Sequence, residues 1–174
     1  MQLIDVSPAA SAALTNTTTE TVLKSHLFPA GFWQVGKVVK ARCCVRAITL
    51  DEDDAPVLVV LLRLGAAALT GTDLGGQATL DRANDDIAVL DIELVCRTAG
   101  SEGVIVGSVL VAKDGAGWPA GSRSYRPACG SVVVVSALDL TAATYLGITG
   151  QWSAASASDS AIAEYLLVSE GSAL

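Results

Sequence analysis

Apolar and polar residues alternate along much of the chain, and this pattern predicts β-strands. Between Val39 and Ala47 the odd positions are apolar, whereas the even positions include lysine and arginine. The segment 87–97 alternates in the same way, with Asp91 and Glu93 on its polar side. A period of two is typical of a strand with one face in the core and the other in solvent.

The segment 57–64 breaks this alternation, because it is apolar at odd and even positions alike and only Arg63 interrupts it. Such a strand either lies centrally with a covered outer face or lies at a subunit interface. We therefore name Val57, Val59 and Leu61 as candidate interface residues. The acidic stretch 51–54 and Pro56, which precede it, predict a turn.

The remaining segments predict further strands separated by loops. Glycines in 99–103 favour a hairpin between the strand at 87–97 and the next one. We expect a long connection over 65–84 with at most one short strand, and a second long loop over 114–128. The further predicted strands are 104–112, 132–138, 145–152 and 162–168.

Seven or eight strands without a long amphipathic helix predict an all-β protein. We expect a jelly-roll-type antiparallel β-sandwich of about eight strands, formed by residues 17–174. Residues 1–16 are expected to be an N-terminal arm or a short helix. In the helical alternative Ser7 is the N-cap and Pro8 occupies the first helical position.

The composition fits a folded chain that associates with other proteins. The 174 residues suffice for one domain, with 51% hydrophobic and only 17% charged residues. The mean hydropathy is positive, which indicates that other copies of the chain cover part of its surface. A membrane-spanning helix needs about 20 apolar residues, and the longest apolar run ends at Arg63, so no membrane contact is expected. The N-terminus has no signal-like pattern, so we expect synthesis and assembly in the cytoplasm.

The charge of the chain bears on its partners. A net charge of −7 argues against binding to nucleic acid, which requires clustered lysine and arginine. Lys37, Lys40, Arg42 and Arg46 lie close together, but we interpret them as the solvated face of a strand.

The residues that catalysis requires are not brought together by any motif. His26 is the single histidine, and neither a G-x-S-x-G motif nor a phosphate-binding lysine loop occurs. The glycine-rich segment 71–76 is followed by no predicted helix and no closing lysine. We expect no catalytic site and no cofactor, so the chain is not expected to be an enzyme.

Metal binding is not favoured either. Cys43, Cys44, Cys96 and Cys129 form no C-x-x-C pair, which argues against zinc. Free thiols are expected, with a Cys43–Cys96 disulfide as the alternative. The acidic loop 81–86 offers oxygen ligands of the kind that Ca²⁺ prefers, but without an EF-hand pattern we favour a solvated turn.

The loop 114–128 holds Trp118, Tyr125 and Arg126, residue types that are enriched at interface hot spots. These side chains either form a contact surface or pin the long loop to the sandwich. We include them among the candidate interface residues.

Several segments in order resemble a known class of proteins. The threonine-rich segment 17–21 leads into 27–39, with the sequence Leu-Phe-Pro-Ala-Gly-Phe-Trp-Gln-Val-Gly-Lys-Val-Val, and the segment 61–65 follows later. Near the end Ile-Thr-Gly-Gln-Trp-Ser occupies 148–153, before the small-residue loop 154–160. This order resembles jelly-roll structural proteins of tailed bacteriophages, of the capsid decoration (cement), head-fibre or tail-tip type.

The resemblance implies a virion protein that assembles in the host cytoplasm. We expect a capsid decoration protein that oligomerises, as a homotrimer, and binds the major capsid protein or another virion protein. The alternative is a tail-tip or head-fibre module that binds a host receptor or glycan through Trp118 and Tyr125. An enzyme of cupin type would need several histidines on facing strands, which this chain lacks.

Overall fold

The computed structural model describes residues 2–48, 57–74, 78–80, 86–114 and 128–172. Within these ranges every regular element is a strand, and no helix occurs. The strands are β1 (Gln2–Ser7), β2 (Leu14–Thr15), β3 (Thr21–Phe28), β4 (Lys37–Ile48), β5 (Leu58–Gly65), β6 (Thr72–Asp73), β7 (Ala78–Leu80), β8 (Asp86–Thr98), β9 (Gly103–Asp114), β10 (Ala128–Leu138), β11 (Thr144–Trp152) and β12 (Ser160–Ser172).

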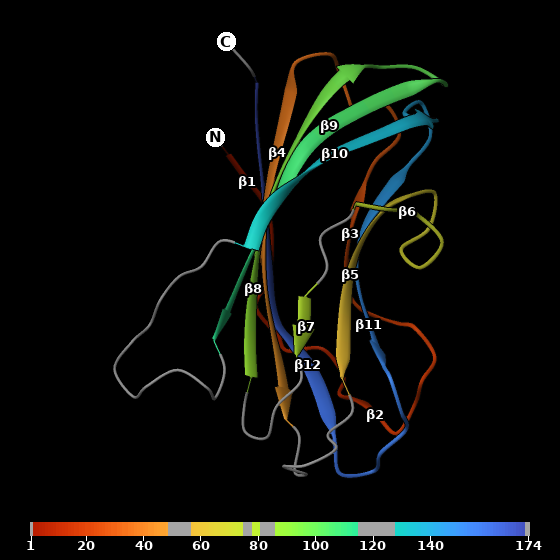
Figure 1. The fold of residues 1–174 in the computed structure, drawn as a ribbon. Coiled ribbons are helices and arrows are strands. Elements are labelled where there is room, and N and C mark those ends of the chain that lie inside the picture. The colour runs from red at the N-terminus through yellow and green to blue at the C-terminus, as the bar shows by residue number, and fades with distance from the viewer. Residues whose placement is uncertain (1, 49–56, 75–77, 81–85, 115–127, 173–174) are drawn as a thin grey trace.

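The strands form two antiparallel sheets that face each other (Figure 1). The large sheet has the order β1-β12-β4-β8-β9-β10, with β2 beside β12. The small sheet has the order β3-β11-β5-β6, with β7 beside β5. In Figure 1, β9 and β10 curve over the upper end of the sandwich. The predicted all-β antiparallel sandwich is therefore confirmed.

The core lies between the sheets and is built from alternate positions of the long strands. Strand β4 contributes its odd positions from Val39 to Ala47, all at most 4% exposed. Strand β8 contributes its even positions from Ala88 to Cys96, all at most 2% exposed. Each buried aliphatic side chain stabilises the fold by about 1.5–3 kcal/mol relative to exposure, so this alternation determines which face of the sheet is inside.

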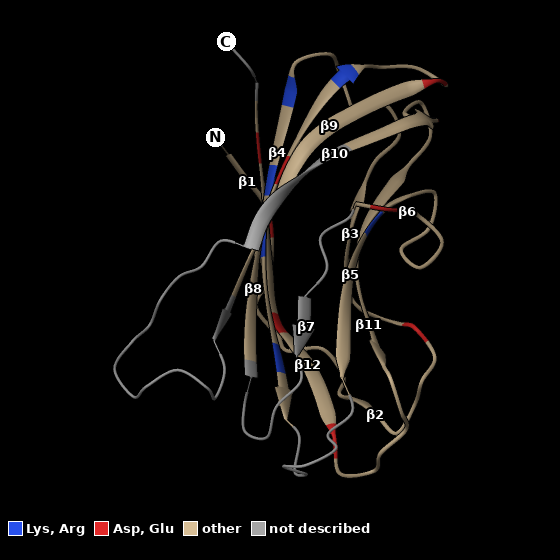
Figure 2. Cartoon of the chain, viewed as in Figure 1, with Lys and Arg blue, Asp and Glu red and all other residues tan. Residues whose placement is uncertain are grey.

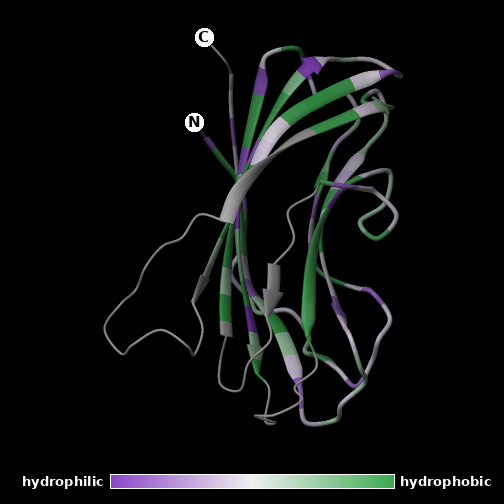
Figure 3. Ribbon diagram, viewed as in Figure 1, coloured by the Kyte–Doolittle hydropathy of each residue, from purple (hydrophilic) through white to green (hydrophobic). Residues whose placement is uncertain are grey.

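Strand β5 is apolar on both sides, as its sequence predicts. Leu58, Val60, Leu62 and Leu64 are fully buried in the core. The side chains between them face outward and are half-buried. Figure 3 shows β5 in green along most of its length, in contrast to the mixed colours of β4.

Two tryptophans anchor the ends of the sandwich. Trp33 is 2% exposed, and its Nε1 donates a hydrogen bond to Thr144 Oγ1 at 2.9 Å. Trp152 is 1% exposed, and its Nε1 donates to the Leu14 carbonyl at 3.1 Å. A buried indole needs a partner for its N–H, and both have one. Both tryptophans belong to the segments that carry the phage resemblance.

Residues 1–16 were expected to form either an arm or a short helix, and the structure contradicts the helix. Residues 2–7 form the edge strand β1, which pairs with β12 and brings the two chain ends together (Figure 1). The short helix expected from Ser7 is wrong, because residues 8–13 have no helical turn. Pairing with β12 gives hydrogen-bond partners to those backbone groups of residues 2–7 that point toward the sheet.

Polar side chains at this edge also connect the two sheets. His26 Nδ1 of β3 lies 2.7 Å from Asp5 Oδ2 of β1. Lys24 Nζ donates to Ser7 Oγ at 2.8 Å. The N-terminal strand is thus held to the small sheet by side chains as well as to the large sheet by its backbone.

The loops follow the sequence expectations in most respects. The predicted hairpin at 99–103 connects β8 and β9, with Gly100 at a φ of 105°, a conformation that glycine adopts readily. The connection 65–84 holds two short strands, β6 and β7, where one was expected. Cys43, Cys44 and Cys96 are free thiols, so the alternative Cys43–Cys96 disulfide is not formed.

Candidate interaction surfaces

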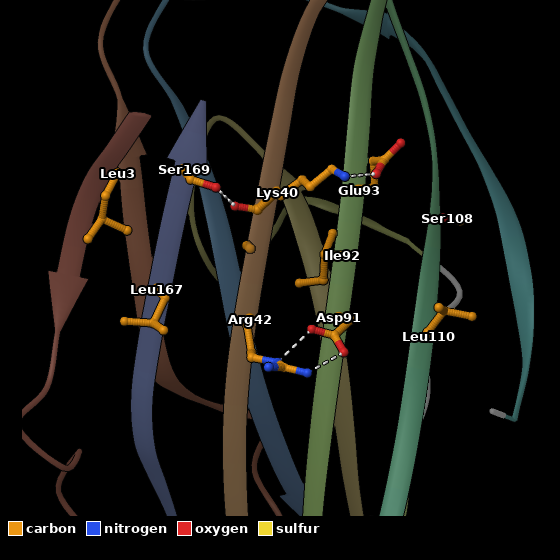
Figure 4. Close-up of a pocket in the computed structure, with 11 residues that line it drawn as sticks. Leu3, Lys40, Arg42, Asp91, Ile92, Glu93, Ser108, Leu110, Leu167 and Ser169 are labelled. Carbon is orange, nitrogen blue, oxygen red and sulfur yellow. Dashed lines mark hydrogen bonds and ion pairs between the residues drawn. The ribbon is translucent and has the colours of Figure 1, made fainter. Parts of the chain in front are cut away.

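The outer side of the large sheet carries an ordered set of charged, hydroxyl and aliphatic side chains. We define the large-sheet face as the outward residues of four adjacent strands, which Figure 4 shows from outside the sheet. They are Leu167 and Ser169 of β12, Lys40 and Arg42 of β4, Asp91 and Glu93 of β8, and Ser108 and Leu110 of β9.

Two cross-strand ion pairs lie at the centre of the large-sheet face. Arg42 binds Asp91 through two hydrogen bonds, Nε to Oδ1 at 2.8 Å and Nη2 to Oδ2 at 3.0 Å. Lys40 Nζ lies 2.8 Å from Glu93 Oε2. Both pairs are solvent-accessible, with side-chain exposures of 48% and 37% for the first and 51% and 48% for the second. Exposed pairs of this kind contribute only about 0–1 kcal/mol to folding.

Lysine and arginine side chains lie along β4, and the carboxylates that face them lie along β8 (Figure 2). The four residues predicted to be a solvated strand face are therefore placed as expected, apart from Lys37. Lys37 pairs with Glu170 at 2.8 Å at the end of β4 and lies over the Phe32 ring at 4.0 Å. The result is a stripe of positive charge beside a stripe of negative charge.

Aliphatic side chains border these stripes. Leu110 is 43% exposed and Leu3, on β1, is 55% exposed, while Leu167 is half-buried. Together with the charged residues they line an open groove of about 530 Å³. In Figure 4, Leu3 and Leu167 lie on one side of the Arg42–Asp91 pair and Leu110 on the other.

Below these two ion pairs lies a short uncharged stretch of the large-sheet face, followed by the Arg46–Glu164 ion pair at 2.8 Å. Tyr165 of β12 and Cys44 of β4 are register partners and are both half-buried. Burial raises the pKa of the Cys44 thiol and the pKa of the Tyr165 hydroxyl above their ordinary values. Both groups are therefore uncharged at neutral pH, and Cys44 is a poor nucleophile there.

The outer side of the small sheet forms a second surface, which is partly covered. We define the small-sheet face as Val22 and Leu27 of β3, together with Val57, Val59 and Leu61 at β5. Val22 and Leu27 are 37% and 46% exposed, whereas the three residues at β5 are half-buried. The structure thus places Val57, Val59 and Leu61 facing outward from the core, as the sequence predicts.

A hydrogen-bonded cluster occupies the centre of the small-sheet face. Arg63 binds Glu20 with two hydrogen bonds, of 2.6 and 2.7 Å, and donates a third to the Gly71 carbonyl. Thr149 Oγ1 donates to Glu20 Oε1 at 2.6 Å. The Arg63 hydrogen bond holds the pKa of Glu20 below its ordinary value, although burial opposes this. The cluster ties the threonine-rich segment to two strands.

The chain between β5 and β6 also lies against this surface. At Gly147 of β11 an added Cβ would be 2.1 Å from the Ala68 carbonyl oxygen. Only a residue without a side chain permits this approach, so the glycine lets the loop pack on the sheet.

Three of the candidate interface residues, Trp118, Tyr125 and Arg126, lie outside the described residues, as does most of the acidic loop 81–86. Sequence reasoning did not find the Glu20–Arg63–Thr149 cluster. The one available signal was Arg63 itself, a cation in an otherwise apolar strand. Sequence reasoning also did not find that Lys40 and Arg42 lie beside Glu93 and Asp91. The available signal was the spacing, since the two cations are two positions apart in one predicted strand and the two carboxylates are two positions apart in another.

Among the described residues no group of three or more His, Cys, Asp and Glu side chains is placed to hold a metal ion. The described part of the chain also contains no helix long and apolar enough to cross a membrane. His26, paired with Asp5, packs edge-on against Phe28 at 4.6 Å between ring centroids.

Comparison with known proteins adds little beyond the fold. No protein-family model matches the chain, and no curated protein sequence matches it. Among solved structures, a legume lectin-like domain from Entamoeba histolytica is similar over 97% of this chain and 89% of its own. The two are 12% identical and superpose with a TM-score of 0.31, which is too low for the similarity to bear on function.

Proposed function

We propose that this chain is a structural subunit of a tailed-phage virion, of the capsid decoration type. The observation that carries the proposal is that aliphatic side chains project outward from both sheets. Leu3, Leu110 and Val134 are 43–59% exposed on the large sheet, and Val22 and Leu27 are 37–46% exposed on the small one. Outward positions of a monomeric sandwich are usually polar, so these residues support a subunit with contacts on two sides.

Two surfaces suit a subunit that binds both its own copies and a particle. The large-sheet face offers an open surface with unburied ion pairs. The small-sheet face offers Val57, Val59 and Leu61, flanked by a rigid hydrogen-bonded cluster. In this proposal the small-sheet face binds the major capsid protein or another virion protein. The homotrimer that the phage resemblance implies remains a prediction.

Antibodies raised against the purified chain provide the test. They should label intact tailed particles released from cells that carry the gene, with regular labelling over the capsid surface. Labelling at the tail end would instead support the tail-tip or head-fibre alternative. Absence of the protein from every particle, by labelling and by mass spectrometry of purified virions, would overturn the proposal.

Variants then test the surface. Val59→Glu with Leu61→Glu should abolish incorporation into particles, because it places charge where an apolar contact is proposed. Ala155→Glu, in an exposed loop between β11 and β12, adds the same kind of charge elsewhere and should leave incorporation unchanged. Circular dichroism melting shows whether the double variant still folds.

One observation favours a second candidate, a receptor-binding or glycan-binding module. The groove on the large-sheet face is lined by Asp91, Glu93 and Ser108, whose oxygens can accept hydrogen bonds from sugar hydroxyls. A glycan array distinguishes the two: saturable binding that Asp91→Asn removes would support this candidate. A blank array combined with capsid labelling would exclude it.

A further inference from the structure

On the outside of the large sheet, two neighbouring rungs, each a row of register partners across four strands, have the same order from either side except that the cation and the anion exchange places. Across β12, β4, β8 and β9, one rung is Leu167, Arg42, Asp91 and Leu110. The next rung is Ser169, Lys40, Glu93 and Ser108. In each rung the two outer residues are of the same kind, leucine in the first and serine in the second, and the two inner residues are a cation and an anion. The outer residues are therefore related by a two-fold axis to residues of the same kind, and each charged residue is related to one of opposite charge.

A second copy fits this pattern in one orientation. A two-fold axis that runs parallel to the strands, between β4 and β8, places β4 of each copy over β8 of the other. It also places β12 over β9. Arg42 then faces the partner's Asp91, and Leu167 faces the partner's Leu110. An axis across the strands would instead place β4 over β4, so that like charges would face each other, which costs several kcal/mol.

We propose that a second copy of this chain covers the large-sheet face through a two-fold axis parallel to β4 and β8. This inference rests on the proposed function in one respect. The proposed subunit binds copies of itself, and the inference names the surface and the symmetry of that contact. In such an isologous contact every interaction occurs twice, so the two rungs give four intermolecular ion pairs.

The exposure of the charged groups is compatible with this contact. Carboxylate oxygens accept more than one hydrogen bond, so Asp91 and Glu93 can bind a cation of their own chain and one of the partner. The open groove of about 530 Å³ leaves room for water around the eight charges. Retained water lowers the desolvation cost that a dry interface between charged groups would incur.

The size of the surface is also compatible. The axis between β4 and β8 also places β1 over β10, so the contact spans six strands. Six strands about 4.8 Å apart are about 29 Å wide, and the eight residue steps from Val38 to Arg46 extend about 27 Å. The footprint is therefore about 780 Å² per copy, within the range of about 600–1,000 Å² per partner in stable complexes. Leu3 and Leu110, at the two borders of the groove, supply exposed apolar area at its rim.

A charge-swap mixing experiment tests both the partner and the orientation. The variant Lys40→Glu/Arg42→Asp/Asp91→Arg/Glu93→Lys keeps each ion pair within its own chain with the signs exchanged. It also keeps the complementarity between two identical copies. In a mixed pair of one wild-type and one swapped chain, however, cations face cations and carboxylates face carboxylates on both rungs.

Unlabelled wild type and ¹⁵N-labelled swapped protein are mixed, equilibrated and analysed by native mass spectrometry. Both proteins alone should form assemblies with even numbers of copies, either a dimer or, with the predicted homotrimer, two trimers joined by the two-fold contact. In the mixture the mixed pair should fall from the statistical one half to less than about one tenth of all pairs. The control swap Lys37→Glu/Glu170→Lys exchanges an ion pair at the strand end, outside the face, and should mix statistically.

The outcomes separate this inference from the proposed function. A chain that stays monomeric at high concentration, assembles only as trimers, or mixes statistically with the swapped variant would overturn the two-fold contact. Enrichment of mixed pairs above one half would indicate β4 over β4 and would also overturn it. Particle labelling is measured independently, so a monomer that labels capsids refutes only this inference, and a swap-sensitive dimer absent from particles refutes only the proposed function.

A second pair of variants measures the aliphatic border. Leu110→Asp should weaken self-association at least about tenfold, because it places a charge opposite the partner's Leu167. Leu27→Asp is the matched control, since Leu27 has a similar exposure of 46% but lies on the small sheet. Sedimentation equilibrium gives both dissociation constants, and equal values for the two variants would contradict the proposed contact.

Discussion

Each outer surface of the sandwich has an arginine held by a carboxylate through two hydrogen bonds, and the two sites differ in almost everything else. Arg63 and Glu20 are 19% and 20% exposed, and Glu20 also accepts a hydrogen bond from Thr149. Arg42 and Asp91 are 48% and 37% exposed and join two adjacent strands. The same chemical pair therefore serves two purposes. Where water is largely excluded it holds the fold together, and where water has access it lies in the face to which we propose that a second copy binds.

The largest expected effect is on the less exposed site. Arg63→Ala leaves Glu20 without its main partner and the Gly71 carbonyl without a donor. We expect a loss of about 2–4 kcal/mol in the free energy of unfolding, since one charge of a largely buried pair is left uncompensated. Urea denaturation measures this. A double-mutant cycle with Glu20→Gln should show strong coupling, and additive effects would contradict the cooperative cluster.

The loop beside that cluster gives the next effect. Gly147→Ala adds a Cβ that would be 2.1 Å from the Ala68 carbonyl oxygen, so the loop or the strand must shift. We expect a cost of about 1–3 kcal/mol by thermal or urea denaturation. Ser25→Ala, at the exposed register partner of Gly147, is the control and should be neutral. Equal stability of both variants would show that the loop does not pack closely on β11.

The pH dependence of stability distinguishes the two sites further. The pKa of Glu20 is lower in the folded protein than its ordinary value of 4.5. Its contribution is therefore complete above pH 4.5 and is lost as the pH falls through the lower, folded-state pKa. The difference in unfolding free energy between wild type and Glu20→Gln should therefore shrink below that pH. A difference that is constant between neutral and acidic pH would contradict this.

The smallest effect on folding is expected at the exposed site. Arg42→Ala should change the free energy of unfolding by less than about 1 kcal/mol, because water screens the pair. Its effect on self-association should be larger than its effect on folding. Measuring both in the same buffer, at low and high salt, checks this. A destabilisation as large as that of Arg63→Ala would show that the two arginines have the same role.

Local pattern was sufficient for much of the fold. Alternation in 39–47 and 87–97 predicted two strands and their inner faces correctly, because burying an aliphatic side chain dominates the choice of face. The two-sided apolar character of 57–64 likewise predicted that Val59 and Leu61 face away from the core. The helix expected from Ser7 failed because the residues that would form it bind β12 instead: Ser11 exchanges hydrogen bonds with Ala163, and Leu14 pairs with Ala161.

By itself the sequence determined that the chain forms strands, which side of each strand is buried, and that charge lies on β4 and β8. Only the tertiary structure decided which strands are neighbours and in which register they pair. That decision aligns Arg42 with Asp91 and Lys40 with Glu93, and it brings Glu20 to Arg63. Such contacts depend on long-range pairing that no local period encodes, because a shift of one residue would move every one of these side chains to the opposite face.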